Sequence, residues 1–178
     1  MSSKGGAKIS IAVSGKAGGI HLSGRANVAC SVLFREVVEH LRTENIDEIF
    51  LFLESCLVMD STFLGVLASL GIPSKASGSE KDVRIKLVSP SERVLALIEN
   101  LGVLDSFEVA ETKPSMDFAF QEVSGSIVND LQEVTRTSLE AHRTLIQINE
   151  ANRARFEGVT TLLEKELEGQ DSPSKRDG

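Results

Sequence analysis

The segment Ile49–Leu53 (IFLFL) constrains the fold most, because five consecutive apolar residues leave no face for water. A strand that is apolar on both faces is usually central in its sheet. The segments before and after this one alternate between strand-like and helix-like patterns. Strands that alternate with short helices indicate an α/β domain, with one mixed β-sheet and helices packed on it.

Two strands and a helix are predicted before the central strand. Residues 8–13 (KISIAV) alternate and carry β-branched side chains, and residues 20–24 (IHLSG) follow the turn cluster at 14–19, so the pair predicts a β-hairpin. The next segment is helical, since apolar residues recur at helical spacing with charged residues between them. These apolar residues are Val32, Leu33, Val37, Val38 and Leu41.

Two more helices and two more strands are predicted after the central strand. Ser89 can cap the third helix, with Pro90 in its first position and Glu92 three residues after the cap. The predicted order is therefore β-β-α-β-α-β-α-β. After a short connection over 54–60, its later members are a helix over 61–71, a loop over 72–82, a strand over 83–88, a helix over 89–102 and a strand over 105–110.

The chain changes character at about residue 113. We expect a domain over 8–112, a helical extension over 113–168, and flexible tails at 1–7 and 169–178. In the extension, apolar residues step by three or four for about fifty residues without proline, which predicts a long helix that Gly125 could divide. The stripe comprises Met116, Phe120, Val123, Ile127, Leu131, Val134, Leu145, Ile148, Phe156, Val159 and Leu163, with gaps at Ser138, Ala141 and Asn152.

This stripe has two candidate partners. The simpler one is a copy of the same helix, which would give a coiled coil and a homo-oligomer through residues 116–167. The other is the domain itself, if the helix folds back on its sheet or helices. Ser138 and Asn152 would weaken a coiled coil but could set its register, and self-association is the outcome we favour.

Composition argues against several classes of partner. The net charge is −7 and the chain has no Trp and no Tyr, so nucleic acid and anionic membrane are not expected to bind it. No apolar run approaches 18 residues, and the first ten residues have no apolar signal segment. The sequence therefore predicts a cytoplasmic protein without a membrane span.

The sequence carries no pattern that predicts a cofactor, a metal or an active site. Cys30 and Cys56 have no further Cys or His at ligand spacing, so we expect free, packed thiols and no zinc. The three histidines, His21, His40 and His142, are scattered and match no nucleophile motif. The glycine-rich turn at 15–19 lacks the ending of a phosphate loop. We therefore expect no enzyme.

One segment resembles a known family. Residues 59–67 (MDSTFLGVL) follow the central strand and a short loop, and they resemble the switch segment of STAS-domain anti-sigma factor antagonists. Residues 24–27 (GRAN) stand where that family has a turn after its second strand. Residues 87–109 (LVSPSERVLALIENLGVLDSFEV) resemble its later strand, Ser-Pro helix, turn and last strand. The resemblance covers about residues 8–112 and leaves the extension unexplained.

The resemblance implies a phosphorylation switch. The acceptor would be Ser61, with the adjacent Thr62 as second choice and Asp60 shaping the site. The partner would be an anti-sigma factor that is also a serine kinase, bound before modification and released after it. Phosphate brings about −1.5 to −2 charge. Beside Asp60 and Glu54 that charge, placed inside an interface, would suffice to eject a partner.

Other interpretations of the same residues remain open. Asp60 or Ser61 could simply cap the helix that follows. Phe63 stands where the family often has glycine; it either shapes the surface beside Ser61 or packs inward, which we favour slightly. Asn27 replaces an acidic residue and Arg25 a glutamate, which leaves the partner's identity open. The alternative function is a scaffold that oligomerises through its C-terminal helix within a signalling assembly.

Overall fold

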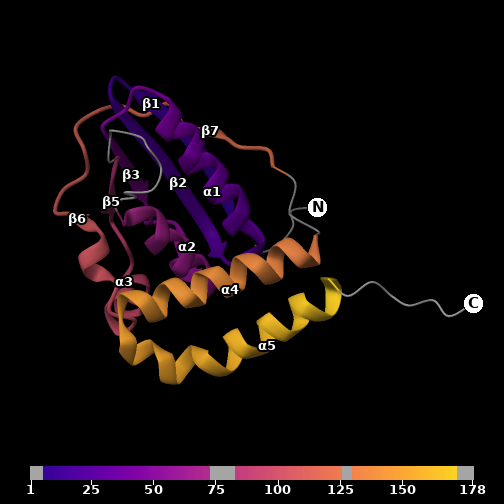
Figure 1. The fold of residues 1–178 in the computed structure, drawn as a ribbon. Helices are drawn as coiled ribbons and strands as arrows, with labels where there is room; N and C mark the ends of the chain where they lie inside the picture. The colour runs from indigo at the N-terminus through magenta and orange to yellow at the C-terminus, as the bar shows by residue number, and fades with distance from the viewer. Residues whose placement is uncertain (1–5, 73–82, 126–129, 172–178) are drawn as a thin grey trace, which may run out of the picture.

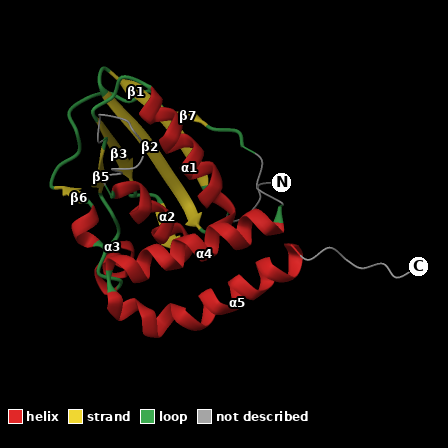
Figure 2. Cartoon of the chain, viewed as in Figure 1, coloured by secondary structure: helices red, strands yellow, loops and turns green. Residues whose placement is uncertain are grey.

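The structure is a computed structural model that describes residues 6–72, 83–125 and 130–171 (Figure 1). Most of the loop predicted over 72–82 lies outside these ranges, as does Ile127 of the apolar stripe. Figure 2 shows a β-sheet with helices along one side of it and two further helices across its lower end.

The sheet is mixed and has the strand order β6-β5-β3-β2-β1-β7. Its inner strands β2, β3 and β5 run parallel, β6 continues the parallel part, and β1 and β7 are antiparallel to their neighbours. The strands are β1 (Lys8–Ser14), β2 (Ala17–Ala26), β3 (Glu48–Phe52), β4 (Cys56–Met59), β5 (Arg84–Val88), β6 (Glu108–Ala110) and β7 (Gln121–Glu122).

The central position of the apolar strand is confirmed, since β3 lies between β2 and β5. Ile49 and Leu51 face the helices and are fully buried, whereas Phe50 and Phe52 belong to a second apolar cluster. Residues 54–60, predicted as a connection, contain the short strand β4, which pairs with the end of β2. This pairing places the end of β4 beside the start of the first helix.

The first three helices follow the prediction, with one correction. Ser91, and not Ser89, caps the third helix, because its Oγ accepts from the Val94 amide at 3.3 Å. Ser89 has a φ of 50°, which removes it from the helical turn. The helices are α1 (Val28–Thr43), α2 (Ser61–Gly71), α3 (Glu92–Asn100), α4 (Leu131–Ile148) and α5 (Arg153–Asp171), with 3₁₀ turns η1 (Leu104–Ser106) and η2 (Glu150–Asn152).

Residues 114–123 form an extended strap and not the start of a helix. The strap crosses the second face of the sheet, where Phe118 packs on Phe52 with ring centroids 5.6 Å apart. A Cβ at Gly19 would meet the Phe118 ring at 2.8 Å, so the glycine makes room for it. Phe118 and Phe120 are two residues apart in extended backbone, so their side chains lie on the same face of the strap. There they cover the aromatic side chains of β3.

The extension folds back on the domain. Helices α4 and α5 lie side by side as a helical hairpin, joined through η2, and α4 packs on α1 and α2 (Figure 1). The apolar stripe is therefore buried in part within the same chain, which is the second of the two outcomes considered. The long helix expected from the spacing is interrupted at η2, and its described helical part begins at Leu131. Association with a second copy stays a prediction.

Candidate functional site

Asp60 joins the N-termini of α1 and α2. It is the N-cap of α2, and its Oδ1 accepts a hydrogen bond from the Phe63 amide at 2.7 Å. Its Oδ2 accepts from the amide of Val28, the first residue of α1, at 3.2 Å. One carboxylate thus satisfies a free amide on each helix, which fixes the two helix starts against each other.

Asn27 lies at the same end of the fold, as the N-cap of α1. Its side-chain oxygen accepts from the Ala29 amide at 3.1 Å, and its own amide donates to the Cys30 sulfur at 3.4 Å. Burial raises the pKa of Cys30 to about 11, so this sulfur remains a protonated thiol at neutral pH. The structure therefore brings Asn27 next to Asp60, as two caps of adjacent helices.

Ser61 is the first residue of α2, and its hydroxyl is engaged. Its Oγ lies 3.0 Å from Nε2 of His142, on the extension helix α4. The side chain is half-buried. Sequence reasoning treated His142 as one of three scattered histidines, because nothing local relates two residues 81 positions apart.

Thr62 makes a parallel contact with the same helix. Its hydroxyl lies 3.1 Å from the Ser138 hydroxyl, and the residue is 6% exposed. Phe63 points the other way, is fully buried and packs on Phe34 with ring centroids 4.8 Å apart. The inward orientation of Phe63 is therefore the one observed, and its ring does not form the surface beside Ser61.

Helices α2 and α4 approach each other most closely at Gly65. A Cβ built on Gly65 would meet the Cβ of Ala141 at 2.7 Å, and the backbone of Ala141 is also in the way. Only a residue without a side chain fits at this point of α2. The close approach is what brings Ser138 and His142 within hydrogen-bond distance of Thr62 and Ser61.

His142 occupies an apolar environment. Its side chain is buried and stacks on Phe156 of α5, with ring centroids 4.7 Å apart. Burial lowers the pKa of His142, while the charge of Asp60 and the Ser138 carbonyl oppose that shift. Within the described residues Nδ1 has no hydrogen bond of ordinary geometry. The lowered pKa favours the neutral imidazole, and its Nε2 contacts the Ser61 hydroxyl.

The gaps in the apolar stripe turn out to be contact positions. Ser138 and Ala141 face α2, as described above. Asn152 is 1% exposed, and its side-chain nitrogen donates to the Leu101 and Leu145 carbonyls at 2.8 and 2.9 Å, which anchors the hairpin turn beside the end of α3. These polar and small residues were the available signal that the helix faces its own domain, since a plain coiled coil would not require them.

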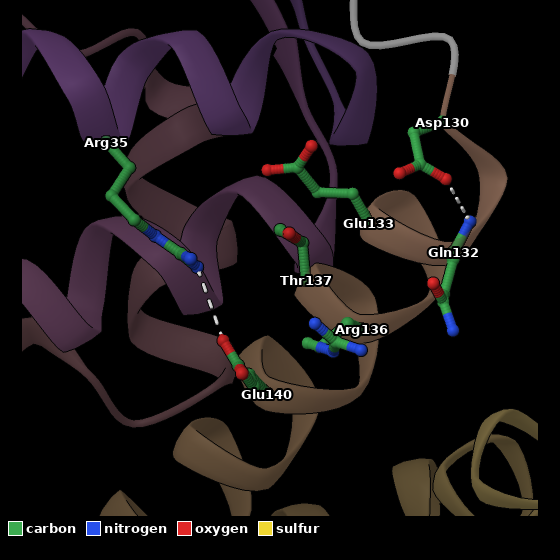
Figure 3. Close-up of a pocket in the computed structure, with 7 residues that line it drawn as sticks. All are labelled: Arg35, Asp130, Gln132, Glu133, Arg136, Thr137 and Glu140. Atoms are coloured by element: carbon green, nitrogen blue, oxygen red, sulfur yellow. Dashed lines mark hydrogen bonds and ion pairs between the residues drawn. The ribbon is translucent and has the colours of Figure 1, made fainter. Parts of the chain in front are cut away.

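A charged cleft of about 270 Å³ lies between the start of α4 and α1 (Figure 3). Arg35 of α1 faces Glu140 of α4, with 3.7 Å between their nearest charged atoms. Arg136, Glu133 and Asp130 complete a lining of both signs. This part of the seam between the domain and the hairpin is therefore polar and open to solvent.

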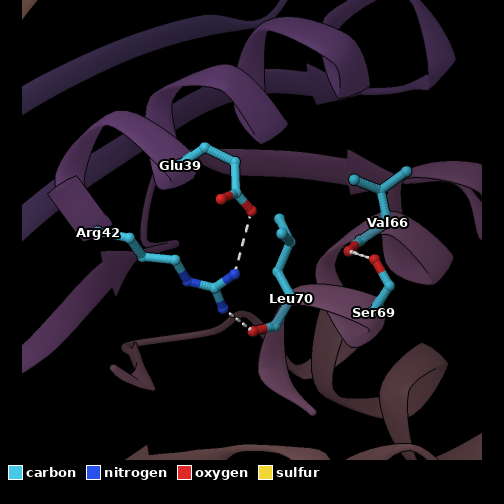
Figure 4. Close-up of polar contacts among 5 residues, drawn as sticks. All are labelled: Glu39, Arg42, Val66, Ser69 and Leu70. Atoms are coloured by element: carbon cyan, nitrogen blue, oxygen red, sulfur yellow. Dashed lines mark hydrogen bonds and ion pairs between the residues drawn. The ribbon is translucent and has the colours of Figure 1, made fainter. Parts of the chain in front are cut away.

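Helices α1 and α2 are also tied at their other ends. The Arg42 guanidinium of α1 donates to the Leu70 carbonyl of α2 and pairs with Glu39 at 3.1 Å (Figure 4). A cation that hydrogen-bonds the last carbonyls of a helix also complements its dipole. The two helices are thus fixed to each other at both ends by side chains of the domain alone.

This arrangement places one hydroxyl where an anion would be favoured. Free amides at a helix start and the helix dipole stabilise negative charge, although Asp60 already uses part of that capacity. Three or more metal-ligating side chains do not come together anywhere in the described ranges. Nor is any described helix both long and apolar enough to cross a membrane.

Comparisons with known proteins agree with the fold. A family model described as the STAS domain matches residues 8–119, which includes the strap up to Phe118. No curated protein matches the chain. A solved structure of an anti-sigma factor antagonist from Mycobacterium paratuberculosis is similar at 13% identity and a TM-score of 0.52, covering 63% of this chain and 92% of that one.

A second solved structure is that of the anti-sigma factor antagonist SpoIIAA in its unphosphorylated form. It matches at 17% identity and a TM-score of 0.46, covering 57% of this chain and 87% of that one. In both cases the coverage of this chain leaves a large part unmatched.

Proposed function

The chain belongs to the STAS domain family, and on that premise we propose that it is a regulatory protein-binding module of the anti-sigma factor antagonist type, switched by phosphorylation of Ser61. Its action is the exchange of protein partners and not catalysis. The partner class is an anti-sigma factor with serine kinase activity, so the output is regulation of transcription.

The observation that carries this proposal is the division of labour between Asp60 and Ser61. Either residue could have capped α2, but the Phe63 amide donates to Asp60. The Ser61 hydroxyl is therefore not used by the helix start, and its hydrogen bond is made to His142 on a separate element. A hydroxyl that the domain's own helix does not require is free to serve as a modification site.

The electrostatics of the site would make a phosphate effective. Phosphorylation adds about −1.5 to −2 charge and three acceptor oxygens. Asp60 lies next to Ser61 and is already committed to two amides, so the added charge meets a carboxylate there. Like charges placed in an interface oppose association, and the effect is local to the surface around the start of α2.

Partner capture with three full-length variants tests the proposal. Ser61→Ala keeps the unmodified state, Ser61→Asp adds the charge, and Ser115→Asp puts the same charge on the exposed strap as a matched control. Proteins retained from the native cell would be quantified by mass spectrometry. We expect Ser61→Asp alone to lose a partner, by about tenfold or more, as a loss of ~1.4 kcal/mol would give.

Equal retention of every partner by Ser61→Ala and Ser61→Asp would contradict the switch.

The alternative, a scaffold that assembles through the extension, is favoured by one observation: Leu131 and Leu162 of the hairpin are 62% and 65% exposed. If it holds, sedimentation of the full chain shows an oligomer that Leu162→Lys reduces to a monomer. A monomer at all concentrations removes this alternative.

A further inference from the structure

We infer that the surface formed by α1 and the start of α2 is a docking surface for one amphipathic helix, that α4 is its resident occupant, and that a docked α4 excludes both a phosphate on Ser61 and a competing partner helix. The inference rests on the proposed function for the relevance of Ser61 phosphorylation. Its physical content, the mutual exclusion, stands on the contacts between α2 and α4.

The docking surface is held together by contacts that do not involve α4. Asp60 fixes the starts of α1 and α2 to each other, and Arg42 fixes their ends, with no residue of the extension involved in either contact (Figure 4). The domain therefore presents a preformed helix pair. Preorganisation of this kind lowers the cost of binding, because little is ordered when a helix docks.

The surface selects a helix by shape. Gly65 leaves a gap in α2 that only a small residue of the facing helix can approach, and α4 supplies Ala141 there. Toward the start of α2, Ser138 of α4, three residues before Ala141, meets Thr62, and His142, directly after Ala141, meets Ser61. A competing partner would need the same combination: a small residue at the crossing, with polar groups that satisfy the two hydroxyls.

A phosphate on Ser61 cannot be accommodated under a docked α4. The gap between Ser61 Oγ and His142 Nε2 is that of one hydrogen bond, 3.0 Å, and a phosphorus atom with its three oxygens does not fit in it. One face of the His142 ring is covered by the stacked Phe156 ring, which limits how the imidazole can turn aside. Room for the phosphate would require α4 to move away from α2, which would break the close contact between Ala141 and Gly65.

Charge works in the same direction as size. The added phosphate would be half-buried beside Asp60, and burial lowers the pKa of His142, which disfavours the imidazolium that could pair with it. Linkage makes the effect reciprocal: whatever free energy phosphate removes from α4 docking, docked α4 removes from phosphorylation. The charged cleft on the α1 side of the seam lets solvent reach this part of the contact (Figure 3).

Phosphoserine installed at position 61 during translation of the full chain tests the exclusion without any kinase. The matched control carries phosphoserine at Ser115 on the strap, which lies in an extended segment and not on α4. Amide hydrogen exchange of peptides from 131–148 reports docking, and peptides from β3 and β5 report that the domain is folded.

With phosphoserine at 61, we expect exchange across α4 to rise by about tenfold or more, since a half-buried unpaired charge is costly, while β3 and β5 stay protected. The phosphoserine at 115 should leave α4 unchanged. Unchanged α4 exchange with phosphoserine at 61 would overturn the inference, and it would leave the partner-capture test of the proposed function standing on its own result.

A second experiment tests whether docked α4 restricts phosphorylation of Ser61. It uses the full chain with Ala141→Arg, which places a long side chain against Gly65. The control is Gln147→Arg on the exposed face of the same helix. We expect Ala141→Arg to raise exchange in peptides covering 61–65, whereas Gln147→Arg does not. If Ala141→Arg releases α4 and the rate at which Ser61 is phosphorylated in cells is unchanged, α4 does not gate the serine and the inference fails.

Discussion

The two faces of α2 differ in chemistry. The face toward the sheet buries Phe63, Leu64 and Leu67 completely, in a continuous apolar core. The face toward α4 presents a glycine and the hydroxyls of Ser61 and Thr62, which form hydrogen bonds with His142 and Ser138. Apolar packing tolerates many arrangements of similar volume, but a polar, close-packed contact depends on each group being in place.

This difference teaches which part of the molecule is suited to change. The apolar face packs into the domain core, to which α4 adds the buried residues Ala141 and Leu145. The polar face has less apolar burial to lose when α4 leaves, and its hydroxyls can exchange their partners for water. A single added charge there acts on the hairpin and not on the domain.

The largest expected effect comes from the apolar face. Phe63→Ala removes a fully buried ring that packs on Phe34, so the free energy of unfolding of the whole domain should fall by about 3–5 kcal/mol. Urea denaturation followed by circular dichroism measures it. The control is Phe120→Ala on the partly exposed strap, with a smaller loss expected. Equal losses would mean that burial of the ring does not set the size of the loss.

The next effect should be confined to the hairpin. Gly65→Val puts a branched side chain against the Ala141 backbone, a clash of the kind that costs about 1–3 kcal/mol. Hydrogen exchange should rise in α4 and α5 while β3 stays protected. The control, Gly158→Ala in α5, has nothing within 4 Å of its new Cβ and should stabilise the helix by up to about 1 kcal/mol. Uniform destabilisation of the whole chain by Gly65→Val would contradict a separable hairpin.

Asp60→Ala tests how much the contact between the starts of α1 and α2 contributes to the stability of the domain. It leaves the Phe63 and Val28 amides without their acceptor, so a loss of about 1–2 kcal/mol is expected, as for other helix caps. Ser91→Ala, which removes the cap of α3 and touches neither face of α2, is the reference for a cap with one bond. A smaller loss for Asp60→Ala than for Ser91→Ala would argue that Asp60 does not join the two helices.

The smallest effect is a pH dependence of α4 docking. Burial lowers the pKa of His142 from its ordinary 6.5, so the released or unfolded state binds the proton more readily than the docked one. Docking is therefore full above about pH 7.5, weakens as the pH falls through about 6.5, and levels off below the lowered pKa. Hydrogen exchange of α4 should show this in the full chain and lose it in His142→Gln, but not in the exposed His40→Gln. An identical pH profile in all three would contradict the assignment.

Local sequence patterns were sufficient for most of the domain. The apolar run at 49–53 predicted a central strand, and Asp60 followed by an apolar helical pattern predicted the start of α2 at Ser61. Both leave a record in the residue types of a short segment of the chain. Strand β4, which the sequence did not predict, is four residues long and depends on its pairing with β2, and no local pattern indicates that pairing.

The contacts of the site could not be predicted in the same way. Ser61 and His142 are 81 residues apart, and only the fold brings them together. The stripe of the extension looked like a coiled coil because apolar spacing does not name the surface that a helix faces. Its interruptions at Ser138, Ala141 and Asn152 carried that information, but only the structure shows their partners in the domain.

Phosphosite mass spectrometry on the protein purified from its native cell tests the central claim most directly. The account predicts phosphate on Ser61 in a fraction of molecules that changes with growth or stress. Absence of phosphate from Ser61 under all growth and stress conditions would contradict it, and the Ser61 hydroxyl would then serve only to hold α4 through His142.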